Sequence, residues 1–302
     1  MRFTKRGVFF GICLVLGQAV IAAEPARAWP PEPLIEMHVP LEPTAFPAGG
    51  RQYLVYELRL TSLATASTGL ARLEVRDGDA PTPATLASYE GAALEAILQH
   101  AVNPAVGDQM PTAGAEYRQL AAGESTIVFL TVVLEPGVPA PAHLVHRLHL
   151  ESTHVDGARV STRHTKLPVI SAPLAGGRWQ ALSGAGDNAS HHRRQFVVLG
   201  GRVLMPTRHA IDWKRSVNGA SSSGTGDDNS DYYSYRQPVL AVAGGRVVAV
   251  RDGFPDNHPG HVGAESFALT RENIGGNYVV LELGGGQFAQ YCTSNPVHCA
   301  SR

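Results

Sequence analysis

The feature that most constrains the fold is the run at residues 127–134, in which every residue except Thr131 is apolar. The run is short, rich in β-branched side chains, and followed by the turn pair Pro136-Gly137. This pattern is typical of a β-strand that is buried on both faces. The raised numbers of glycine (32) and proline (21) also favour a β-rich, turn-rich chain over a helical bundle.

A second segment, residues 53–61, alternates between apolar and polar side chains. Successive side chains of a strand point to opposite faces, which puts Glu57 and Arg59 on one face. The opposite face carries Leu54, Tyr56, Leu58 and Leu60. Further strands are expected at 73–76, which stops at the turn Asp77-Gly78, and at 144–150.

One helix is expected at residues 86–99, because Leu94, Ile97 and Leu98 recur at helical spacing. Many short strands joined by glycine and proline turns indicate two packed sheets. Residues 29–172 are therefore predicted to form a β-sandwich-like domain.

The first 28 residues have the pattern of a secretory signal peptide. Three positive charges in residues 1–6 precede an apolar stretch at 8–23, and small residues follow, including Ala26-Arg27-Ala28. The alternative is a single membrane anchor, but the stretch is shorter than the roughly 20 apolar residues that a spanning helix needs. We expect an exported protein, periplasmic or extracellular, with no membrane span after signal cleavage.

The net charge excludes one class of partner. The 25 Lys and Arg residues are balanced by 26 Asp and Glu residues. Proteins that bind nucleic acids through phosphate contacts carry a clear excess of basic residues. We therefore expect no nucleic-acid partner.

After a linker at residues 168–173, two glycine-linked hairpins are predicted. The first joins 239–243 to 246–250 at Gly244-Gly245, and the second joins 277–283 to 287–291 at residues 284–286. Glycine adopts positive φ freely, as hairpin turns require. The predicted fold class is mostly β: a β-sandwich-like domain followed by an incomplete antiparallel sheet domain at 173–291.

Residues 174–291 resemble the lysostaphin-type zinc endopeptidases, peptidase family M-23, which cleave peptide cross-links in bacterial cell walls. The resemblance is carried by A-I-D-W at 210–213, by P-V-L-A-V-A-G-G-R-V-V-A-V-R-D-G at 238–253 and by G-N-Y-V-V-L-E-L-G-G-G-Q-F-A-Q-Y at 276–291. It implies a compact antiparallel sheet of the duplicated-hybrid-motif type, zinc as cofactor, and peptidoglycan or cell-wall peptides as partners.

The resemblance also implies a set of zinc ligands: a His, an Asp four residues later, and the second His of a late H-x-H. Asp212 matches the family's Asp, but Arg208 stands four residues before it and His209 three. On a strand, His209 would face away from the metal unless a bulge redirected it. Asp212 and His209 are the candidate metal ligands; the alternative is that Arg208 pairs with Asp212 in a remnant site. No catalytic residue is assigned.

Other polar groups have both functional and structural interpretations. His191 and His192 lie near the cleft or are surface residues beside Arg193 and Arg194. Four further histidines fall on both faces of a strand region, which argues against a metal site; they are His143, His146, His149 and His154. Two groups are expected to be loop residues; they are the pair His258 and His261, and the acidic Asp227, Asp228 and Asp231. The tripeptide Asn188-Ala189-Ser190 fits a glycosylation acceptor, which is irrelevant in a bacterial host.

The tail at residues 292–302 departs from the family. Thr293 stands where an assisting His is expected, and Cys292 and Cys299 lie within eight residues. Codons allowed for this tail, read from the third base, encode H-L-Q-P-G-S, the continuation that the family shows. We therefore predict a frameshifted tail; the alternative is a natural divergent end with a Cys292–Cys299 disulfide.

The sequence thus predicts an exported protein of the peptidoglycan endopeptidase lineage, with doubtful zinc binding and no peptidase activity in this truncated form. The alternative is a non-catalytic protein of the cell envelope that binds cell-wall peptides or regulates an envelope enzyme.

Overall fold

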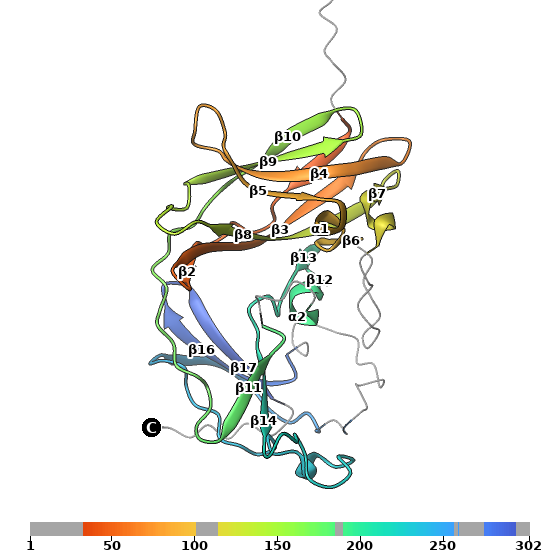
Figure 1. Cartoon of the computed structure of the whole chain (residues 1–302). Helices are drawn as coiled ribbons and strands as arrows, with labels where there is room; N and C mark the ends of the chain where they lie inside the picture. Colours follow the sequence, from red (N-terminus) through yellow and green to blue (C-terminus); the bar gives the residue numbers. More distant parts are fainter. Residues whose placement is uncertain (1–32, 101–113, 185–189, 257–258, 260–274, 294–302) are drawn as a thin grey trace, which may run out of the picture. The chain divides into compact units, whose positions relative to one another are not determined.

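A computed structural model describes residues 33–100, 114–184, 190–256, 259 and 275–293 (Figure 1). The chain is mostly β, as predicted, and its strand pairs are antiparallel apart from one isolated parallel bridge. The predicted signal segment lies outside the described residues. Among the residues described, no helix combines the length and the apolar character needed to cross a membrane.

Two five-stranded sheets contain most of the strands in the first half. The strand order of the first sheet is β1 (Ile35–His38), β3 (Arg51–Ser62), β8 (Ser125–Leu134) and β6 (Leu98–His100), and β2 (Phe46–Ala48) also pairs with β3. The strand order of the second sheet is β10 (His154–Ser161), β9 (His143–Leu150), β4 (Thr68–Asp77) and β5 (Thr85–Glu90), and β7 (Gln119–Leu120) also pairs with β4.

The two sheets share one hydrophobic core, which is what a β-sandwich requires. The four apolar residues predicted to share a face of β3 are each at most 1% exposed; they are Leu54, Tyr56, Leu58 and Leu60. They pack in one cluster with Leu73 of β4 and Leu148 of β9. The alternation of apolar and polar residues therefore predicted the inner face of β3 correctly.

The predicted helix at 86–99 is wrong over most of its length. Residues 85–90 form β5 and pair with β4, and only α1 (Gly91–Glu95) is helical before β6 begins at Leu98. The apolar residues of that prediction, Leu94, Ile97 and Leu98, are all buried. The spacing identified core residues, but pairing with β4 outweighed the helical period of a short segment.

Strand β8 is buried on both faces, as its apolar run predicted. Val128, Leu130 and Val132 point into the sandwich core. On the other face, Ile127 and Phe129 pack against Phe196, which comes from the second half of the chain. A short hairpin follows Phe196 and consists of β12 (Val197–Leu199) and β13 (Arg202–Leu204). Val203 of β13 and Met205 just after it also pack against this second cluster.

The second half contains two further antiparallel units. One pairs β11 (Arg178–Leu182) with β14 (Asp212–Ser216), and the other is the sheet of β15 (Arg246–Arg251), β16 (Asn277–Gly284) and β17 (Gln287–Thr293). The remaining short helices are α2 (His191–Arg194), η1 (Ala115–Arg118) and η2 (Asn229–Asp231).

Of the two predicted hairpins, one is correct. Strands β16 and β17 form the second, and the three glycines at 284–286 all have positive φ. The first is wrong, because residues 239–242 bind the linker instead: the Leu240 amide donates to Pro173 O, and the Ser171 amide donates to Val242 O. Strand β15 pairs with β16.

Candidate metal centre

The short helix α2 is held at its start by Ser190. The Ser190 hydroxyl accepts from the backbone amide of His192 at 3.2 Å and lies 3.0 Å from the carbonyl oxygen of Ser183, to which it donates. A serine in this position satisfies an amide that the first turn of a helix leaves without a partner. The cap fixes how His191 and His192 leave the backbone.

His192 is buried, and its ring orientation follows from its hydrogen bonds. Nδ1 lies 2.9 Å from the carbonyl oxygen of Ser183 and 3.3 Å from that of Ala210. A carbonyl oxygen only accepts, so Nδ1 carries the proton. The other ring nitrogen, Nε2, lies 3.4 Å from Oδ1 of Asp212.

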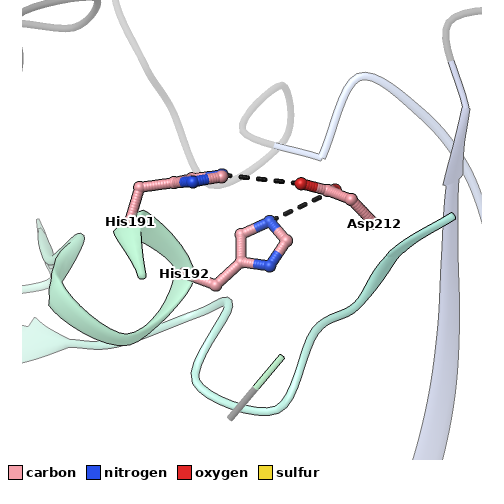
Figure 2. A group of neighbouring side chains, drawn as sticks. All are labelled: His191, His192 and Asp212. Atoms are coloured by element: carbon pink, nitrogen blue, oxygen red, sulfur yellow. Dashed lines mark ion pairs between the residues drawn. The ribbon is translucent and has the colours of Figure 1, made fainter. Parts of the chain in front are cut away.

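Asp212 is the first residue of β14 and lies beside both histidines (Figure 2). Its Oδ2 is 3.8 Å from Nε2 of His191, and the two imidazole rings lie 4.2 Å apart, centre to centre. The side chain of His192 is 10% exposed, whereas those of His191 and Asp212 are 53% and 52% exposed. The group thus combines one buried side chain, that of His192, with two that are accessible to solvent.

These three side chains form a group that could hold a metal ion, since one ligand atom from each lies within 4.8 Å of the others. Two imidazole nitrogens and a carboxylate oxygen are typical zinc ligands. With metal–ligand bonds of about 2.1 Å, two ligand atoms of a tetrahedral site lie about 3.4 Å apart. The separation of His192 Nε2 and Asp212 Oδ1 matches that value. The hydrogen bond from Nδ1 to a carbonyl is also the usual support of a metal-binding histidine.

The structure separates the two ligands predicted from the sequence. Asp212 belongs to the group, but His209 does not; it is exposed and lies in the turn at 206–209, before β14 begins. The strand geometry assumed for His209 is therefore wrong. The alternative, a pair between Arg208 and Asp212, is not found either, because Arg208 donates to Glu57 through Nε at 3.0 Å and through Nη2.

The sequence drew attention to His191 and His192 but did not place them beside Asp212, about twenty residues away. The signal that could have found them is the Ser190 cap followed by two histidines. The alternative that they lie on the surface beside Arg193 and Arg194 holds for His191 alone. His192 is 8% exposed, Arg193 0% and Arg194 5%.

The four histidines of the sandwich do not come together as a metal site among the described residues. His146 is in the core, bonded to Tyr56 at 2.8 Å, and His143 pairs with Asp79 at 2.7 Å. His149 lies 3.3 Å from Glu74, and its ring contacts that of His154.

The acidic loop is bonded to itself, as expected of a loop. The Asp231 carboxylate accepts from the backbone amides of Gly226 and Asp228. Five residues of the sequence predictions lie outside the described residues; they are Asn188, Ala189, His258, His261 and Cys299. The glycosylation acceptor, the loop position of the H-x-x-H pair and the alternative Cys292–Cys299 disulfide therefore stay predictions.

A scan against models of protein families found no match, and neither did a search of curated proteins. The residues of the chain and the geometry of the His191–His192–Asp212 group are therefore the observations that bear on function.

Proposed function

We propose that this chain is an exported zinc-binding protein of the peptidoglycan endopeptidase lineage, with the ion held by His191, His192 and Asp212. The observation that carries the proposal is the orientation of His192. Its Nδ1 is committed to a backbone carbonyl, and its Nε2 lies 3.4 Å from a carboxylate oxygen. An imidazole nitrogen and a carboxylate oxygen at this separation can both bind one zinc ion.

The chemistry of such a site follows from its ligand number. A zinc ion with three protein ligands keeps one position open, and a bound zinc ion supplies a Lewis acid that polarises a carbonyl. The exposed side chains of His191 and Asp212 leave the group accessible from solvent. The lineage part of the proposal is supported by the three sequence segments at 210–213, 238–253 and 276–291.

We propose that this 302-residue chain binds without cleaving. Thr293 is the last residue of β17 and stands where the resembled family has an assisting His. A threonine hydroxyl cannot serve as a general acid or base near neutral pH, whereas an imidazole can. This residue favours the second candidate, a non-catalytic protein that binds cell-wall peptides, over an active peptidase.

The experiment measures zinc content and peptidoglycan binding on the same purified protein. The wild type should bind one zinc per chain and sediment with purified peptidoglycan, without releasing soluble fragments. Asp212→Asn should lower the zinc affinity at least tenfold, and Asp156→Asn, a surface carboxylate paired with Arg147, should not. Absence of stoichiometric zinc would refute the metal site, absence of peptidoglycan binding would refute the lineage, and fragment release would refute the non-catalytic assignment.

A further inference from the structure

A buried carboxylate on the sandwich contacts two arginines from the second half of the chain. Glu57 lies on the outward face of β3, yet it is only 1% exposed. Its Oε1 accepts from Nη1 of Arg193 and from Nε of Arg208, and its Oε2 accepts from Nη2 of Arg208. One carboxylate therefore holds two guanidinium groups, of which that of Arg193 is fully buried and that of Arg208 is 12% exposed.

The two arginines lie in the two segments that build the metal centre. Arg193 directly follows His192 in α2, and Arg208 precedes Asp212 by four residues. Glu57 is thus the shared partner of the His192 segment and the Asp212 segment.

Arg193 is fixed further by the backbone of the sandwich. Its Nη2 donates to the carbonyl oxygens of Tyr56 at 2.9 Å and Leu130 at 3.1 Å, on the neighbouring strands β3 and β8. The Arg193 guanidinium is a cation at neutral pH. A planar guanidinium with several fixed acceptors has little freedom to rotate.

The two segments also bond to each other next to the ligands. Thr207 Oγ1 donates to the carbonyl oxygen of His192 at 3.0 Å, and Nδ1 of His192 lies 3.3 Å from the carbonyl oxygen of Ala210. A displacement of the turn at 206–209 would therefore move both the His192 ring and the start of β14.

We propose that Glu57 and Arg208 are positioning residues for the metal centre: the Glu57 carboxylate ties Arg193 and Arg208 and so sets the distance between His192 and Asp212. This inference rests on the proposed zinc binding. Groups outside the ligand set that orient ligands commonly change metal affinity 10- to 100-fold when they are replaced.

The test uses the full chain with Arg208→Met, which keeps the balanced Glu57–Arg193 pair and most of the side-chain volume. Arg208→Lys keeps the charge but loses the two-point contact. Val75→Ala, in the core strand β4, serves as a control that loses stability without touching either segment. For each folded variant we would measure zinc affinity by competition with a fluorescent chelator, and the visible absorption of bound Co²⁺, which reports coordination geometry.

Arg208→Met should weaken zinc about tenfold and reduce the intensity of the Co²⁺ bands, Arg208→Lys should recover part of both, and Val75→Ala should leave both unchanged. Equal zinc affinity and equal spectra in wild type and Arg208→Met would overturn the positioning role while leaving the proposed function intact. A wild type that binds neither ion would overturn both. Equal weakening in Val75→Ala would assign the effect to general stability and overturn the inference.

If Arg208→Met does not fold, the nitrogen chemical shifts of His192 in Arg208→Lys give a second readout without metal. Shifts that differ from those of the wild type would support the positioning role, and unchanged shifts would contradict it.

Discussion

The hydroxyl of Tyr56 lies 2.8 Å from Nε2 of His146, and this pair joins β3 of one sheet to β9 of the other across the sandwich core. His146 is 0% exposed, and its Nδ1 lies 3.0 Å from the carbonyl oxygen of Ala158. Burial lowers the pKa of His146 to about 4 from an ordinary value of 6.5, so the ring is neutral in the folded protein at neutral pH.

The first prediction is that acid destabilises the sandwich through His146. The unfolded chain binds a proton near pH 6.5 and the folded chain near pH 4, so stability is fully present above about 6.5 and falls as the pH drops toward 4. The full effect is about 3 kcal/mol. Urea unfolding at several pH values between 4 and 7 measures it, and the double variant Tyr56→Phe/His146→Phe should lose this slope. An unchanged slope in the double variant would assign the acid sensitivity to other groups.

The second prediction concerns the buried charges at Glu57. Glu57→Gln leaves Arg193 and Arg208 without their anion, and breaking such a buried pair costs about 3–5 kcal/mol. The matched control is Glu42→Gln, because Glu42 pairs with Arg163 on the surface and should cost less than about 1 kcal/mol. Chemical denaturation of both variants checks the difference, and similar losses would show that the cluster is not closed to solvent.

The third prediction ranks the histidines as zinc ligands. His192→Ala should lower zinc affinity more than tenfold, because it removes the buried ligand whose ring is fixed by Ser183. His191→Ala should have a smaller effect, because that side chain is 53% exposed and lies farther from Asp212. His209→Ala should have none; a tenfold loss there would restore the ligand pair expected from the sequence.

The fourth prediction concerns the approach of residues 244–245 to β16. A Cβ on Gly245 would meet the backbone oxygen of Glu282 closer than real Cβ atoms come, whereas one on Gly244 would meet nothing within 4 Å. Gly245→Ala should therefore displace the start of β15 and cost about 1–3 kcal/mol, while Gly244→Ala should be near neutral. Hydrogen exchange of the β15 and β16 amides would locate the loss, and equal protection in both variants would argue against this close approach.

Local patterns predicted the strands and their inner faces because those depend on neighbours in the sequence. The alternation in β3 identified Tyr56 as a core residue, and the apolar run of β8 predicted two buried faces. The same pattern placed Glu57 on the outward face but could not show that it is buried, because Arg193 lies 136 residues away.

Only one residue of the candidate metal centre was proposed as a ligand from the sequence. Asp212 was named from the family resemblance, whereas the residues beside it depend on a turn at 206–209 and on a serine-capped helix, neither of which has a regular sequence period. The prediction of the first hairpin was wrong because residues 239–242 form hydrogen bonds with the linker. A repeating pattern of apolar residues does not predict such a contact.

The outer face of β8 and the neighbouring Glu57 have an evolutionary consequence. Phe129 packs against Phe196, and Glu57 binds Arg193, so the two halves of the chain carry matched apolar and charged surfaces. If either half were joined to an unrelated neighbour, the aromatic side chains and the charges of this contact would lose their partners. A substitution at Glu57 or Arg193 alone would leave the other residue buried without its partner, so we expect the two positions to change together.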